Sequence, residues 1–134
     1  MASETPVVRH LIACQEIVTE DDGRARSLRK LMQTIERLPG EPFPCKREKM
    51  ALFALLTNGR GKHKFAVELT IHERGEELWL RRSQSREVDL GQDPVEVLGM
   101  PIPMKNVSFP RAGQYTFHLL WNGQRIAEER VEVR

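Results

Sequence analysis

Cysteine is scarce in this sequence of 134 residues, which contains only Cys14 and Cys45. A small domain held together by disulfides needs more cysteines, and a structural zinc site usually needs them in closely spaced pairs. The sequence therefore predicts neither of these. We interpret both cysteines as small apolar side chains in a reducing compartment, which favours a cytoplasmic location.

The net charge of the chain is small, and aromatic residues are few. The formal net charge is +2, and aromatic residues make up 6% of the chain. Nucleic-acid and membrane partners usually require a strong positive balance, and unpaired bases stack on exposed aromatic rings. We therefore expect neither a nucleic-acid partner nor a membrane partner.

Long apolar runs are missing as well. The most hydrophobic stretch, Met50 to Leu56, is far shorter than the roughly 20 residues that cross a bilayer. The first residues show no basic segment followed by an apolar one, so no secretory signal is expected. The length suits one domain with its own core. We expect a single domain over residues 1–134, with residues 1–6 as a disordered tail.

The clearest pattern that is present is alternation of apolar and polar residues near the C-terminus. Tyr115, Phe117, Leu119 and Trp121 occupy every second position, and Asn122-Gly123 follows directly. Period-two alternation interrupted by Asn-Gly is the strongest short-range signal of a β-hairpin. This segment therefore predicts two antiparallel strands joined by a tight turn.

Further strands are predicted along most of the chain. Val7 to Val18 is a strand candidate whose centre, Leu11 to Cys14, is apolar on both parities, and Met50 to Thr57 is the most hydrophobic run; both are typical of inner strands. Residues 65–71 alternate as a half-buried strand does. Residues 81–94 are polar and predict a long connection with one short strand near Val88 and Leu90. About seven to eight strands with regular turn signals indicate an all-β antiparallel sandwich.

Two segments are informative for other reasons. Between residues 95 and 107, Pro101 and Pro103 share one parity, so both missing N–H groups lie on the same side of a strand. Such a strand fits a sheet edge, where that side faces solvent.

Residues 27–38 carry apolar residues at helical spacing, and the same residues also fit a return strand. A short helix in 27–38 and a strand remain alternatives at this point.

The segment from Gly113 to Phe117 looks like the tyrosine corner of immunoglobulin-like sandwiches, in which a tyrosine hydroxyl anchors upstream backbone. The whole chain resembles a family of short bacterial proteins known only as a domain of unknown function. The resemblance is carried by Leu11 to Glu16, Phe43-Pro44, Met50 to Leu56 and Val107 to Phe117. It implies an immunoglobulin-like β-sandwich in a bacterial cytoplasm and no catalytic residue. Relatives have a strand at 27–38, so we favour a strand there.

The sequence shows no clear pattern of a catalytic site or of a metal-binding site. The histidines, His10, His63, His72 and His118, show no spacing that places two ligands together, so we expect scattered surface or half-buried side chains. Asp21 and Asp22 precede a glycine, which is typical of a solvated turn rather than a calcium loop. No Gly-x-Ser-x-Gly motif occurs. We predict no enzyme activity, no metal and no cofactor.

Two groups of residues are candidates for binding. Arg60, Lys62 and Lys64 lie in a glycine-containing turn that could hold an anion, although a strand follows where phosphate loops need a helix. Trp79, followed by Arg81 and Arg82, has the parity opposite to its apolar neighbours and would mark a binding or self-association surface if it points outward. We expect a binding or protein-interaction module with a protein partner or a second copy. A small-ligand or carbohydrate-type binding sandwich is the alternative.

Overall fold

The structure is a computed structural model, and it describes residues 5–20 and 26–134. Most of the expected tail at residues 1–6 and the turn that carries Asp21 and Asp22 lie outside the described residues. None of the described residues is helical, and so no helix among them could cross a membrane. They form ten strands: β1 (Val7–Thr19), β2 (Arg26–Leu31), β3 (Thr34–Ile35), β4 (Cys45–Thr57), β5 (Lys62–Glu73), β6 (Glu76–Arg82), β7 (Arg86–Asp89), β8 (Leu98–Phe109), β9 (Gly113–Trp121) and β10 (Gln124–Val133).

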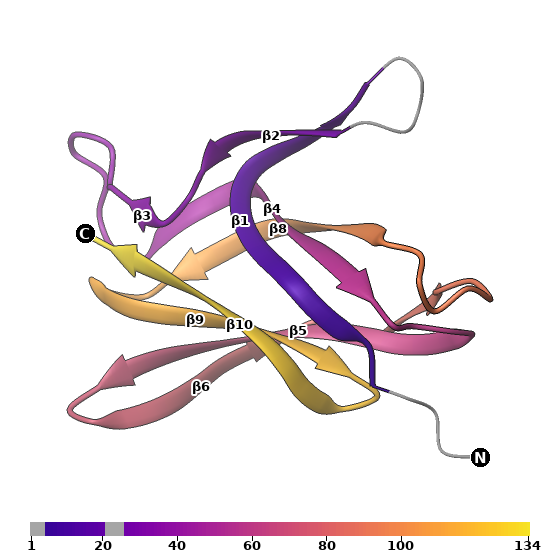
Figure 1. Cartoon of the computed structure of the whole chain (residues 1–134). Coiled ribbons are helices and arrows are strands. Elements are labelled where there is room, and N and C mark those ends of the chain that lie inside the picture. The colour runs from indigo at the N-terminus through magenta and orange to yellow at the C-terminus, as the bar shows by residue number, and fades with distance from the viewer. Residues whose placement is uncertain (1–4, 21–25) are drawn as a thin grey trace.

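The strands build two stacked sheets; in Figure 1, β2, β4 and β8 of the first lie above β9, β5 and β6 of the second, and β3 of the second lies at the upper left, near the C-terminus. The first sheet has the order β2-β1-β4-β8, and the second has the order β3-β10-β9-β5-β6, with β7 also paired to β5. Every pair is antiparallel except β3 with β10, which is parallel. The predicted all-β sandwich is confirmed, and the expected seven to eight strands were too few.

The core lies between the sheets and is formed by the alternating rows that the sequence predicts. In the paired strands β5 and β9, Leu69 lies opposite Phe117, and both are buried. Phe109 of β8 enters from the other sheet and packs edge-on against Tyr115 and Phe117, with ring centroids 5.0 and 6.5 Å away. Aromatic rings prefer this edge-to-face geometry. The two sheets are therefore joined by a compact aromatic cluster.

The predicted hairpin and tyrosine corner are both present. Asn122 and Gly123 have φ angles of 47° and 87°, which is the positive-φ pair that a type I′ turn requires. The Tyr115 hydroxyl donates to the carbonyl oxygen of Arg111 at 2.5 Å and accepts from its N–H at 3.2 Å. The buried phenol thereby fixes the chain just before β9.

Residues 27–38 contain strands, so the favoured interpretation is confirmed and the alternative of a short helix is wrong. β2 pairs with β1 in the first sheet, whereas β3 pairs with β10 in the second. The chain crosses between the sheets near Met32, whose N–H donates to the carbonyl of Ala13 at 2.9 Å. The hydrogen bonds of both sheets outweigh the local helical propensity.

Two sheet edges matter for the rest of the molecule. β8 pairs only with β4, so the prediction of an edge strand that contains Pro101 and Pro103 is confirmed. Along the other sheet, β6 and β7 follow each other on the outer side of β5, where residues 83–85 interrupt them. The segment expected as a long connection, residues 81–94, holds the end of β6 and one short strand, β7, which contains Val88, and its other residues are not strand.

Candidate functional site

A large hollow lies between these two edges. It has a volume of about 940 Å³ and runs between β8 on one side and β6 and β7 on the other. We call it the β6–β8 groove. Its lining comes from β4, β5, β9, residues 81–90 and residues 98–105. One side of the sandwich is thus hollowed, and the outer end of the core forms the floor of the hollow.

The floor of the groove is apolar because it is the outer end of the core. Phe65, Val67, Met100 and Leu119 line it, and each is less than a tenth exposed. Ile102 is half-buried and packs against both parts of the core. Apolar clefts with a few polar groups at their borders are typical of binding sites.

The border of the groove is basic. Arg81, Arg82, Arg86 and Lys105, which we call the basic rim, all line it. None of the four forms an ion pair with another described residue. Arg81 is held across the groove, since its Nη1 donates to the carbonyl of Asn106 in β8 at 3.1 Å. The rim therefore offers positive charge to a partner.

The only acidic residue of the lining, among the described residues, is Asp89. Its carboxylate accepts from the N–H of Gly91 at 2.8 Å. This bond closes the turn after β7, so part of the acid's hydrogen-bonding capacity is used within the protein. The charge balance along the groove remains positive.

The interruption between β6 and β7 is built by Ser83. Its N–H donates to the carbonyl of Val67 at 2.8 Å, and its hydroxyl accepts from the N–H of Val67 at 2.9 Å. The side chain thus replaces a backbone partner for β5. Gln84 and Ser85 are not paired with β5, and both line the groove.

The structure places the predicted binding residues in three locations. Arg81 and Arg82 belong to the groove. Trp79 is 61% exposed and lies opposite Thr70, on the outer face of the second sheet. Arg60, Lys62 and Lys64, the basic turn, lie near the start of β5 and are not part of the groove lining. The sequence did not single out Arg86, Lys105 or the methionines of β8.

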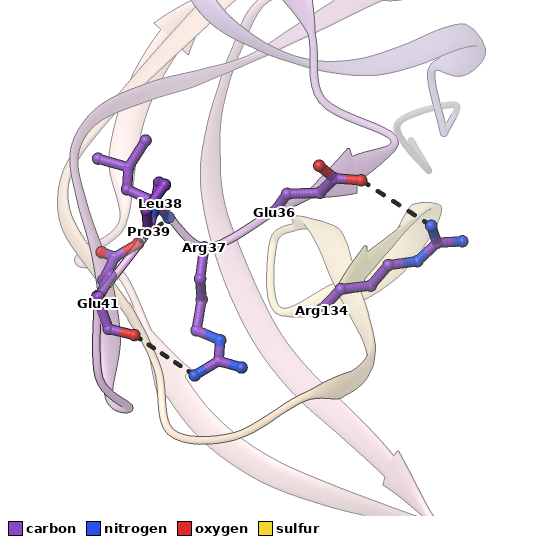
Figure 2. Close-up of a pocket in the computed structure, with 7 residues that line it drawn as sticks. Glu36, Arg37, Leu38, Pro39, Glu41 and Arg134 are labelled. Carbon is purple, nitrogen blue, oxygen red and sulfur yellow. Dashed lines mark hydrogen bonds and ion pairs between the residues drawn. The ribbon is translucent and has the colours of Figure 1, made fainter.

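A smaller hollow lies beside the loop before β4, and Figure 2 shows its charged lining. Its volume is about 540 Å³. Arg134 faces Glu36 at 4.0 Å, and Arg37 donates to the carbonyl of Glu41 at 3.4 Å. Glu41 also pairs with Arg47 at 2.9 Å. Glu36 and Glu41 each pair with an arginine, so this hollow has a less one-sided charge than the groove and offers a partner less apolar surface.

A polar network covers the outer face of the second sheet. His118 is only 4% exposed, which differs from the expected surface or half-buried histidines. Its Nε2 lies 3.0 Å from the hydroxyl of Thr70 and 3.2 Å from Glu77 Oε1. Arg125 bonds both Glu77 and Glu68, and its Nη2 is 2.7 Å from Glu77 Oε1. We call these five residues the outer-face network.

The network is arranged for stability rather than for nucleophilic catalysis. A hydroxyl–histidine–carboxylate relay places the nucleophile and the acid on opposite ring nitrogens. Here Thr70 and Glu77 both face Nε2, and Thr70 is fully buried. Among the described residues, no group of three or more His, Cys, Asp or Glu side chains is placed to hold a metal ion.

Two pKa shifts in the network predict lower stability at acid pH. Burial lowers the pKa of His118 from 6.5, although Glu77, Glu68 and Glu128 oppose this. Hydrogen bonds from Arg125 lower the pKa of Glu77 from 4.5. The unfolded chain therefore binds protons more readily at both groups. Stability is lost as pH falls below about 6.5 through His118 and below about 4.5 through Glu77.

We expect the midpoint of thermal unfolding to fall between about pH 7 and pH 5, and to fall less in the His118→Gln variant. Thermal scans at several pH values measure this difference. The control is His72→Gln, which changes an exposed histidine of the same sheet and should keep the full decrease. Equal decreases in the unmodified protein and in His118→Gln would contradict the role of His118.

The fold and the groove together define a two-sheet β-sandwich with an open, basic-rimmed side. The chain belongs to the family of unknown function DUF6941, whose model matches residues 12–134. The predicted resemblance to an uncharacterised family is therefore confirmed. No curated protein matches the chain.

Among solved structures, the chain is similar to the alkylpurine DNA glycosylase AlkC of Pseudomonas fluorescens, bound to DNA containing an abasic site analog. The TM-score is 0.54 at 13% sequence identity. The match covers 99% of this chain and 31% of the glycosylase chain. At this identity the likeness shows the fold alone.

Proposed function

We propose that this protein is a non-enzymatic binding module whose β6–β8 groove holds a partner with an apolar body and negative charge. The observation that carries the proposal is the combination of an apolar floor with four basic rim side chains that form no ion pair among the described residues. An apolar floor provides affinity by releasing water, and convergent charged groups select the partner and its orientation.

A nucleic-acid partner is not part of the proposal. The net charge of +2 is too small for a strong phosphate-driven affinity, and the floor is aliphatic rather than aromatic apart from Phe65. The DNA bound by the similar glycosylase is not transferred to this chain, because the likeness concerns the fold. The charge of the rim suits a partner with few acidic groups.

The fluorescence of anilinonaphthalene sulfonate, an apolar anion, tests this function. We expect the triple variant Arg82→Gln, Arg86→Gln, Lys105→Gln to bind the probe about tenfold or more weakly, since a hydrogen bond to a charged group contributes about 1.5–3 kcal/mol. Arg81 is retained because it also bonds β8. Titration of the folded protein with the probe gives the dissociation constants.

The basic turn provides a matched control. The triple variant Arg60→Gln, Lys62→Gln, Lys64→Gln removes the same number of charges outside the groove. It should bind the probe as tightly as the unmodified protein. Equal losses in both variants would show that net charge alone attracts the probe, and this result would contradict a site in the groove.

A protein-contact role is the second candidate, and Trp79 is the observation that favours it. Its side chain is 61% exposed on the outer face of edge strand β6, and Leu78, on the opposite face of the same strand, is 37% exposed. Exposed large apolar side chains on a sheet edge are typical of contact surfaces. A partner protein or a second copy of this chain would cover them.

Two finer features complete the proposal. The tyrosine corner at Tyr115 supports an immunoglobulin-like sandwich. Cys14 and Cys45 are free and buried, and burial raises the pKa of both thiols. Unreacted, unpaired thiols of this kind fit the reducing environment of the cytoplasm.

A further inference from the structure

We propose that the occupant of the β6–β8 groove is a long-chain carboxylate, a single anionic head group on an unbranched apolar chain. This inference rests on the proposed function and names its ligand class. Four features of the groove carry it: the two edges, the length, the distribution of charge and the methionines.

The edge formed by β8 is unsuited to the addition of a peptide strand. Pro101 and Pro103 lie opposite Phe53 and Ala51 of β4 and have no N–H group. A strand added along β8 would miss two hydrogen bonds on the same side, and this is how natural edge strands avoid pairing. The groove therefore cannot bind a peptide through a regular ladder on this side.

The opposite edge is also unsuited to strand addition. β6 ends at Arg82, β7 begins at Arg86, and Ser83 between them is bonded to Val67 through both its N–H and its hydroxyl. The register of β6 with β5 also shifts between Leu69 and Thr70. A peptide bound between two such edges would leave some of its backbone N–H and C=O groups without hydrogen-bond partners. A ligand that has no peptide backbone does not carry this cost.

The shape of the groove suits an unbranched chain. Its lining follows β8 from Leu98 to Lys105, which corresponds to about 23 Å at about 3.3 Å per residue. Met100 and Met104 line it from this strand. Methionine side chains are flexible and polarisable, and they adapt to apolar chains of different length and conformation.

Three of the four basic rim residues, Arg81, Arg82 and Lys105, lie toward one end of the groove, whereas Arg86 of β7 lies opposite Phe65 of β5, farther along. Arg81 bonds the carbonyl of Asn106, so Arg81 lies beside the end of β8 that carries Lys105. The opposite end contains the apolar side chains of Leu56, Leu90 and Leu98. An acidic peptide would need positive charge along its whole length. A carboxylate head beside Lys105 and a tail toward Leu98 match the observed distribution.

Calorimetric titration with unbranched alkyl carboxylates below their micelle concentrations tests the inference. We expect the affinity to rise about fourfold per added methylene between octanoate and dodecanoate, because each buried methylene adds a constant increment. Lys105→Gln should weaken dodecanoate binding about tenfold and leave dodecanol binding unchanged. Leu98→Glu should weaken dodecanoate more than octanoate. This pattern would support the inference.

Two other results would overturn it. If an alternating leucine–glutamate hexapeptide displaces anilinonaphthalene sulfonate and dodecanoate does not, the ligand class is wrong and the proposed function stands. If dodecanoate binds equally well to the unmodified protein, Lys105→Gln and Leu98→Glu, it binds elsewhere and the inference fails. If the probe itself does not bind the groove, both the inference and the proposed function fail, so the two failures are distinguishable.

Discussion

Replacing Phe117 with alanine is expected to lower the free energy of unfolding by about 3–5 kcal/mol. The Phe117 side chain is 1% exposed and stands edge-on to Phe109, with the two rings at 90°. Its removal leaves a cavity where the two sheets meet, and the surrounding strands can only partly close it. Urea denaturation followed by circular dichroism measures the change, provided that the slope with urea stays constant.

The matched control is Phe53→Ala in the first sheet. Phe53 is only half-buried and lies on the outer face of β4, since its neighbours Leu52 and Ala54 are the buried ones. We expect a loss of about 1 kcal/mol, the average for a point substitution. Equal losses for Phe117→Ala and Phe53→Ala would contradict a core in which the row from Tyr115 to Trp121 faces inward.

Filling the β6–β8 groove should abolish its binding capacity. Ile102 is half-buried in the groove, and in Ile102→Trp the larger indole would occupy space that a ligand needs. We expect the affinity for anilinonaphthalene sulfonate to fall more than about tenfold, since the apolar contact of the probe with the floor is lost. Probe titration measures the affinity, and thermal unfolding checks that the variant is folded.

Overpacking can itself destabilise a fold by about 1–3 kcal/mol, so a second variant and a control accompany this test. Met104→Trp fills the groove at another half-buried position of the same strand. Leu55→Trp places the same side chain on the outer face of β4, where it should leave probe binding unchanged. Undiminished binding by both groove variants would contradict the site.

Much of the fold can be predicted from the sequence, because the alternation of apolar and polar residues shows which side chains of a strand face the core. The row from Tyr115 to Trp121 and the Asn122-Gly123 turn predict the last hairpin, and the parity of Pro101 and Pro103 predicts the edge position of β8. In each case one local physical constraint, burial or a missing donor, decides the structure.

Other parts of the fold depend on partners that are distant in sequence. The crossing from β2 to β3 and the parallel pairing of β3 with β10 are decided by hydrogen bonds to β1 and β10. The burial of His118 was missed for a similar reason. It faces the outer side of the sheet, and Glu77 and Arg125, which meet above it, come from different strands.

The groove was only partly predictable. Arg81 and Arg82 were selected because they follow the outward-facing Trp79, yet Trp79 itself is not part of the groove lining. Lys105 and Met104 were missed because nothing in a single sequence shows that the edge of β8 faces β6 and β7 across the sandwich. The two prolines of β8, which indicated an open edge, were the available signal.

Chemical-shift mapping of the isotopically labelled protein with anilinonaphthalene sulfonate tests the central claim most directly. Binding in the β6–β8 groove predicts that the largest shifts occur at residues 81–90 and 98–105, with small shifts at the basic turn and at residues 36–41. Shifts concentrated at residues 36–41 or around Trp79, or no shifts at all, would contradict it.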